Sequence, residues 1–146
     1  MTRAQRLQPV QRLADDNERR LAQSLATLER RLSDAESKLG ELQRYRQEYE
    51  HQLNARAGLG IGVPELRDYQ AFLARLSEAI RQQGNVVQRA RSERDLERTR
   101  WQEAAVRAKA VDHVIEQWQT EERRALDRRD QRESDERAQR KVQQQQ

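Results

Sequence analysis

The stretch ARAGLGIGVPE, residues 55–65, is the one clear break in an otherwise helix-forming chain. It holds Gly58, Gly60 and Gly62, followed by Pro64. Glycine is common just past the end of a helix, and proline suits the first turn of the next one. The stretch therefore predicts a turn, at about residues 57–63, between two helices.

Apolar residues on both sides of this turn recur with alternating steps of four and three. We call these positions the seam. Before the turn the seam reads Leu21, Leu25, Leu28, Leu32, Ala35, Leu39, Leu42, Arg46, Tyr49 and Leu53. After it the seam reads Tyr69, Leu73, Leu76, Ile80, Gln83, Val87, Ala90, Arg94, Glu97, Trp101, Ala104, Ala108, Val111, Ile115 and Trp118. Such a sustained heptad repeat is specific to coiled coils, and a short turn makes neighbouring helices antiparallel. The sequence predicts an all-α fold, a two-helix antiparallel coiled-coil hairpin.

The two arms of this hairpin are expected to be unequal. We predict a single domain over residues 1–146, with helices at about 9–56 and 64–137 and a frayed tail at 138–146. The residues before Pro9 are expected to form a loose arm or a kinked turn. If Leu53 faces Tyr69, the numbers of opposing residues add up to about 122. Beyond about residue 120 the second helix then has no partner in the first.

The composition supports this fold over a globular or disordered one. Charged residues make up 37% of the chain and hydrophobic residues 34%, which is too few for an ordinary core but enough for one stripe per helix. Disorder is the competing interpretation of such polarity, and the regular heptads argue against it. The chain shows no signal-like segment and no apolar run approaching the ~18 residues of a membrane span. We therefore expect a cytoplasmic protein.

The charge pattern argues against electrostatic binding as the main function. The net charge is +4, and 26 Arg stand against 3 Lys. Positive charge can indicate a nucleic-acid partner. The signs alternate, however, as in RRDQRESDERAQR, and mixed signs along a helix are typical of a solvated face. A basic coiled coil that serves as a scaffold or binds nucleic acid stays open as an alternative.

The sequence gives no support for catalysis. Its two histidines, His51 and His113, lie on different helices and cannot meet in the expected register. The chain has no cysteine, which excludes disulfides and thiolate metal sites. The GLGIG stretch lacks the Lys-Ser/Thr that a phosphate loop requires. We expect no enzyme, no cofactor, no metal and no small-molecule substrate.

Four of the six aromatic residues lie between positions 45 and 72. Tyr49 and Tyr69 belong to the seam, but Tyr45 and Phe72 occupy g positions of the heptad. The g positions on the two helices share one side of an antiparallel pair, the g edge, which reads Lys38, Tyr45, Gln52, Phe72, Ala79 and Val86. The opposite e edge reads Glu36, Gln43, Glu50, Gln70, Ser77 and Gly84. Edge positions are usually charged, so the apolar g edge is a candidate protein-binding face. Alternatively, Tyr45 and Phe72 only widen the seam near the turn.

The stretches LQRYRQEYEHQLN and LRDYQAFLARLSEAI, on either side of the glycine-containing turn, resemble the FliJ family of flagellar type III export proteins. The resemblance covers the length, both helices and the turn. The equivalent coiled-coil proteins of injectisomes are the nearest alternative.

This resemblance implies a stalk-like protein, similar in shape to the coiled-coil stalk of the F-type ATPase γ subunit. It implies entry into the hexameric export ATPase FliI, promotion of ring assembly, contact with the membrane export gate FlhA, and handling of export chaperones. The protein would lie at the cytoplasmic face of the inner membrane. The implied gate contact comprises Leu42, Tyr45, Tyr49, Phe72, Leu76 and Ala79. Lys38 and Gln83 belong to the same patch but depart from the family pattern, in which Gln and His are expected.

The open end of the hairpin is the expected contact with the ATPase ring. The second helix runs past its partner there and carries arginines among acidic residues. Its candidate ring-binding residues are Arg123, Arg124, Arg128, Arg129 and Arg132. An unpaired helix of this polarity suits a polar, charged channel.

Overall fold

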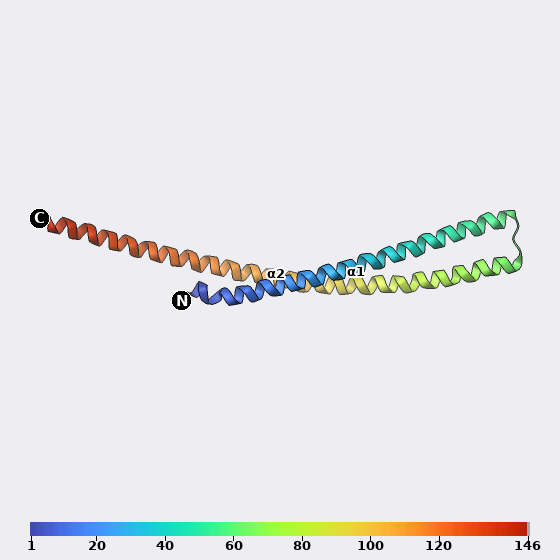
Figure 1. Cartoon of the computed structure of the whole chain (residues 1–146), viewed down its shortest axis with the longest axis horizontal. Coiled ribbons are helices and arrows are strands. Elements are labelled where there is room, and N and C mark those ends of the chain that lie inside the picture. The colour runs from blue at the N-terminus through green and yellow to red at the C-terminus, as the bar shows by residue number, and fades with distance from the viewer. Residues whose placement is uncertain (146) are drawn as a thin grey trace. The chain divides into compact units, whose positions relative to one another are not determined.

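The protein consists of two long helices joined by a short turn. The structure is a computed structural model, and it describes residues 1–145. Helix α1 spans Arg3–Leu59 and helix α2 spans Val63–Gln144, and no strand occurs in the described chain (Figure 1). The helices pack against each other in antiparallel directions, which confirms the predicted fold class and the unequal arms.

The contacts divide the chain into two units. The hairpin unit is Leu21–Trp101 and contains the turn, whereas the terminal unit comprises Met1–Arg20 and Gln102–Gln146. Each unit takes one part of α1 and one part of α2. The prediction of a single domain stays a prediction.

The core of the hairpin unit is narrow. Leu32, Ala35 and Val87 are buried together, and Leu39 and Ala90 pack against them. Every seam position predicted from the heptads is buried or half-buried. The heptad assignment is therefore confirmed along both helices.

The register also agrees with the sequence. In the hairpin unit, Ser24 Oγ donates a hydrogen bond to Glu97 Oε2 at 3.0 Å. In the terminal unit, Gln11 Nε2 donates to Asp112 Oδ1 at 2.7 Å. The residue numbers of these pairs add up to 121 and 123. The predicted sum of about 122 is confirmed in both units.

The turn is shorter than predicted, because α1 continues to Leu59 and α2 already begins at Val63. Gly60 ends α1 with a left-handed φ of +91°, and its N–H donates to the carbonyl of Ala57 at 3.3 Å. Glycine takes up this conformation without steric strain. The carbonyl of Gly62 then accepts the first hydrogen bond of α2, from Leu66 N–H at 3.0 Å.

The prediction of a loose arm or kinked turn before Pro9 was wrong, because α1 begins at Arg3. Gln5 N–H donates to Thr2 Oγ1 at 3.2 Å, and Thr2 N–H donates to Gln5 Oε1 at 3.0 Å. This reciprocal capping box satisfies two backbone donors at the helix start. With this cap the helix begins upstream of Pro9, and the missing N–H of Pro9 removes only one backbone hydrogen bond.

The frayed tail was also misplaced, because α2 continues to Gln144. The N–H of Gln145 still bonds the carbonyl of Lys141 at 3.2 Å. The last part of the expected tail, Gln146, lies outside the described residues. The tail is low in complexity, yet its Gln, Arg and Lys residues are good helix formers and neither Gly nor Pro interrupts them.

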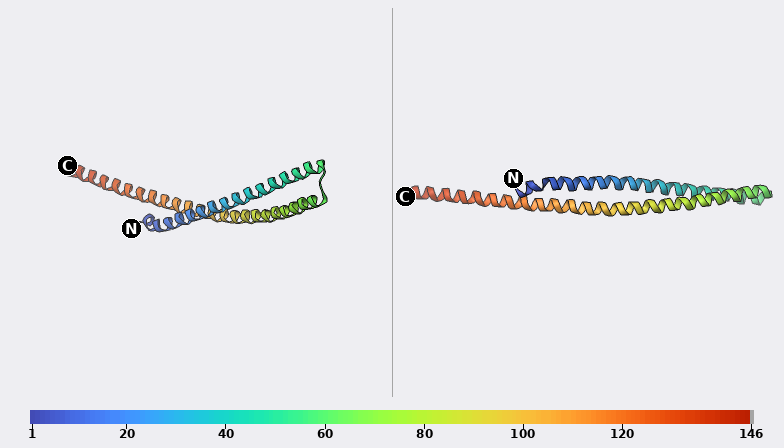
Figure 2. Two further views of the ribbon diagram at one scale, coloured as in Figure 1. Left: turned by 45° about the vertical axis from the view of Figure 1, so that its right-hand side comes forward. Right: turned by 90° about the horizontal axis from the view of Figure 1, so that it is seen from below.

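In the terminal unit, the start of α1 lies beside α2 (Figure 2). Ala104, Ala108 and Ile115 form the buried positions of α2 there. The Arg3 guanidinium stacks over the Trp118 ring at 4.7 Å and pairs with Glu121 at 2.8 Å. All residues from 123 to 145 are exposed.

Gln83 is the one polar residue of the described chain that is buried, and it lies in the seam. Its side chain is 9% exposed, and Nε2 donates across the helix pair to the carbonyl of Ala35 at 3.0 Å. A buried polar group in a coiled coil fixes the register at some cost in stability. We infer that Gln83 holds α2 in its observed register.

We expect Gln83→Leu to raise the free energy of unfolding by about 1–2 kcal/mol, because leucine suits a d position and buries more apolar surface. Gln83→Ala should lower it instead, because it leaves a cavity and a lost hydrogen bond. Urea unfolding followed by circular dichroism measures both, with Gln82→Leu as the exposed neighbouring control. If Gln83→Leu were as unstable as Gln83→Ala, the amide hydrogen bond would contribute net stability to the fold, and the inference that it fixes the register at a cost in stability would be wrong.

Candidate protein-binding surfaces

Four aromatic rings form one connected cluster beside the turn, within the hairpin unit. Tyr49 lies at its centre. The Tyr49 ring is 4.3 Å from Phe72, 5.0 Å from Tyr69 and 6.2 Å from Tyr45, measured between ring centroids. Tyr45 meets Phe72 edge to face at 5.9 Å. Three of these pairs are tilted and one is edge to face, and all have centroid distances typical of favourable aromatic contacts, so the cluster joins the ends of α1 and α2 near the turn.

The cluster has an inner part and an outer part. Tyr49 and Tyr69 are half-buried in the seam, whereas Tyr45 remains 48% exposed. Phe72 is half-buried against Tyr49. Phe72 therefore does widen the seam, while Tyr45 leaves about half of its surface available.

The other predicted gate residues are distributed between the seam and the g edge. Leu76 is buried, Leu42 and Ala79 are half-buried, and Lys38 is exposed. Further along the g edge, Val86 is 45% exposed. The exposed part of the predicted patch is thus formed by Lys38 and Tyr45, and Val86 extends the apolar edge. Gln83 lies in the seam and contacts α1 instead of solvent.

The e edge differs chemically from the g edge. It carries two ion pairs between the helices, Glu36–Arg91 at 3.5 Å and Glu29–Arg98 at 3.8 Å. On the g edge side, Arg56 and Glu65 pair next to the turn, but no ion pair of the described residues joins Lys38, Tyr45 or Gln52 of α1 to α2. Exposed pairs add little stability, but their charges keep the e edge hydrated. The g edge is the apolar face of this unit.

A third, exposed face of α2 carries the Glu78–Arg81 pair. The hydrogen bond from Arg81, more than the charge of that residue, lowers the pKa of the Glu78 carboxyl. The same hydrogen bond raises the pKa of Arg81. Both groups lie in solvent, so the pair marks a hydrated surface.

The five candidate ring-binding arginines lie on the exposed part of α2 in the terminal unit. Arg129 pairs with Glu133 at 3.5 Å, one turn along the same helix. The side chains of Arg123, Arg124, Arg128 and Arg132 are exposed as well. All five lie on the stretch of α2 from residue 123 to residue 145, in which every residue is exposed.

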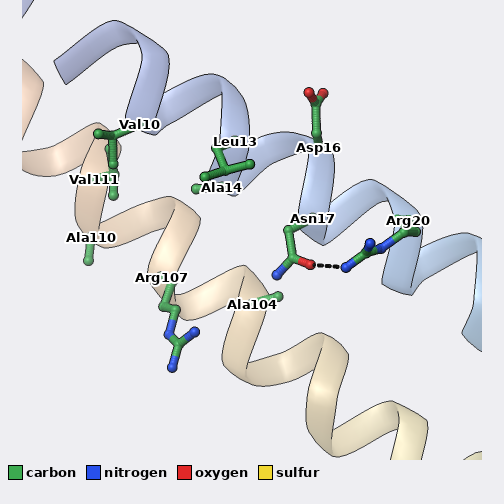
Figure 3. A pocket seen from close by; sticks show the side chains of 10 residues that line it. All are labelled: Val10, Leu13, Ala14, Asp16, Asn17, Arg20, Ala104, Arg107, Ala110 and Val111. Carbon is green, nitrogen blue, oxygen red and sulfur yellow. Dashed lines mark hydrogen bonds between the residues drawn. The ribbon is translucent and has the colours of Figure 1, made fainter. Parts of the chain in front are cut away.

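Sequence reasoning missed an apolar groove in the terminal unit. It has a volume of about 660 Å³ and lies between α1 and α2 (Figure 3). Ten residues line it: Val10, Leu13, Ala14, Asp16, Asn17, Arg20, Ala104, Arg107, Ala110 and Val111. Val10 and Leu13 lie outside the seam. Two large apolar residues at non-seam positions were the feature of the sequence that could have indicated this groove.

Two kinds of site do not occur in the part of the chain that the structure describes. No group of three or more His, Cys, Asp or Glu side chains between residues 1 and 145 is arranged to hold a metal ion. Neither helix, over the same residues, is long and apolar enough to cross a membrane.

The fold is that of a two-helix coiled-coil protein, and it leaves one aromatic edge partly exposed. Comparison with models of protein families matches residues 3–146 to the family described as "Flagellar FliJ protein". The chain belongs to the FliJ family, which confirms the resemblance seen in the sequence. It is therefore a component of the flagellar export apparatus, in a family that is not enzymatic. No curated protein and no solved structure matches the chain.

We expect the inner and outer rings to differ in their effect on stability. Tyr49→Ala should lower the free energy of unfolding by about 3 kcal/mol, because its half-buried ring contacts three other aromatic rings. Tyr45→Ala should lower it by about 1 kcal/mol or less, because half of that ring is already in water. Chemical denaturation of the two variants tests the order, and equal losses would contradict it.

Proposed function

We propose that this protein is the stalk-like factor of the flagellar export apparatus. In this role it promotes assembly of the export ATPase ring, links the ATPase to the export gate, and handles export chaperones. It acts at the cytoplasmic face of the inner membrane, without catalysis and without a cofactor. The observation that carries the proposal is the aromatic g edge beside the turn, left partly exposed in a chain of the FliJ family.

The gate contact is proposed at the turn end of the hairpin unit. Tyr45 is an aromatic side chain held in place by Phe72 and Tyr49, so little side-chain freedom is lost when it binds. Lys38 adds a positive charge on the same edge. Leu42, Tyr49, Phe72 and Leu76 support this surface from the seam, and the contribution of Gln83 is to hold the register.

The contact with the ATPase ring is proposed on the exposed part of α2. A single helix whose side chains are all in water buries no core of its own, so nothing in its own unit competes with a partner there. Its mixed charges suit polar contacts that can exchange between equivalent subunits of a ring. Such contacts are screened by salt. The chaperone-handling role rests on the family alone.

Gate binding is tested by changing the exposed part of the patch and sparing its inner part. We expect Tyr45→Asp to weaken binding to the cytoplasmic domain of the gate protein FlhA by at least about tenfold, because the change places a charge at an apolar anchor. Titration calorimetry measures the affinity, and circular dichroism should show unchanged helicity.

Ser77→Asp is the matched control, because it adds the same charge on the e edge at a similar distance from the turn. It should bind the gate domain like the unchanged chain. Equal loss of binding in both variants would indicate a general charge effect, and unchanged binding of Tyr45→Asp would remove this face from the gate contact.

The stalk role is tested by cutting the chain after Glu122. This keeps Glu121 and Glu122, which bond Arg3 and the backbone of Ala4, and removes only exposed residues. We expect the shortened chain to lose its stimulation of ring assembly and ATPase activity while binding the gate domain normally.

A full-length variant with the five candidate arginines changed to glutamine should show the same partial loss. Stimulation by the unchanged chain should also fall as salt concentration rises. Full stimulation by the shortened chain would move the ATPase contact to another part of the molecule.

A further inference from the structure

The apolar groove of the terminal unit is not used by either proposed contact. Its apolar lining consists of Val10, Leu13 and Ala14 of α1 with Ala104, Ala110 and Val111 of α2. None of these residues belongs to the gate patch or to the exposed arginines of α2. The groove is therefore a separate feature that needs its own explanation.

The groove exposes two large apolar side chains that do not contribute to the seam between the helices. Leu13 is 71% exposed and Val10 is 46% exposed. Seam packing in this unit is carried by other residues, including Ala4, Ala108 and Ile115. Apolar side chains gathered in a groove, rather than scattered singly, are typical of an interaction site.

Positive charge borders the groove. Arg20 lies at one end of the α1 side, where its Nη2 donates to Asn17 Oδ1 at 2.7 Å, and Arg107 lies on the α2 side (Figure 3). The carboxylate of Asp16 points away from α2. The lining thus holds two guanidinium groups, Arg20 and Arg107, against the one carboxylate of Asp16. An apolar groove with an excess of positive charge is complementary to an apolar ligand with negative charge beside it.

We propose that this groove binds an amphipathic α-helix of another protein. The helix would place apolar side chains at i, i+3 or i+4, and i+7 along the apolar lining, and acidic side chains against Arg20 and Arg107. A third helix that lies along the groove between two packed helices can bury its apolar face there. Its side-chain ridges then fit the grooves of the pair, as they do between the two helices themselves. The proposal does not depend on the gate or ATPase contacts proposed above.

The exposed part of α2 from a second copy of the chain is a poor candidate for the helix that occupies the groove. Residues 123–145 contain eight Arg and Lys against five Asp and Glu, so their net charge repels Arg20 and Arg107. Their only large apolar side chains are Leu126 and Val142, which are too far apart to form a stripe. Charge and pattern thus favour an acidic partner over a second copy docking through this helix.

The experiment uses two synthetic helices with the full-length chain. Both are about 18 residues long, or five turns, and carry leucine at the heptad a and d positions; one has glutamate at its flanking positions and the other has lysine. Fluorescence anisotropy measures binding, and NMR chemical shifts of the labelled chain locate it. We expect the acidic peptide to bind at least about tenfold more tightly than the basic one and to shift the amides of Val10, Leu13, Ala110 and Val111.

Two variants and one control make the result specific. Leu13→Asp should reduce binding of the acidic peptide by about tenfold, and Leu96→Asp, at an exposed leucine of the hairpin unit, should not. Arg107→Glu should weaken the acidic peptide and strengthen the basic one. Because Leu13 and Arg107 are exposed, circular dichroism should show full helicity in both variants.

Three results would overturn the proposal. The first is equal binding of the two peptides. The second is a shift map that lies outside the groove. The third is a dimer in sedimentation velocity that Leu13→Asp dissociates, because a second copy would then occupy the groove. None of these results would bear on gate binding or ATPase stimulation, which use other residues.

Discussion

The structure depends on a seam that is only one side chain wide. With hydrophobic residues at 34%, each helix can bury a single stripe, and the core of the hairpin unit is built from Leu32, Ala35 and Val87. Small apolar side chains repeated along a helix would pack nearly as well one heptad away. The Gln83 amide distinguishes these alternatives, because only the observed register gives it the carbonyl of Ala35. That register also brings Tyr45 and Phe72 together, so the proposed gate-binding surface depends on the same register.

Most of the fold could be predicted because burial and periodicity are linked. A position in the heptad determines which face of the helix a residue occupies, and the seam from Leu21 to Trp118 was assigned correctly on that basis. The helix ends could not be predicted in the same way, since they depend on local hydrogen bonds. Thr2 and Gln5, for example, form a capping box through two hydrogen bonds between side chain and backbone. Because of this cap the helix begins before Pro9, and the heptad pattern does not reveal such bonds.

The candidate surfaces were predictable to different degrees. The aromatic edge follows from the heptad positions of Tyr45 and Phe72, since g positions on antiparallel helices share a side. The sequence could not show how far each ring is buried, because that depends on the contact each makes with Tyr49. The groove at Val10 and Leu13 was missed for another reason. Single apolar residues at exposed positions are normal, and only the packing of α1 on α2 shows that these two line one cavity.

The two edges of the hairpin unit differ in charge, and this difference bears on the proposed binding role. On the e edge, Glu36–Arg91 and Glu29–Arg98 hold charges in water and oppose sideways association of exposed apolar surface. On the g edge, the charges give way to Phe72, Ala79 and Val86, and a partner can bury surface that the hairpin has no third helix to cover. A two-helix protein has too little interior to enclose a binding site. Under the proposed function, its choice of partner therefore depends on side chains at its surface, here on the apolar g edge. The asymmetry of its edges is therefore the feature on which the proposed binding role of this coiled coil rests.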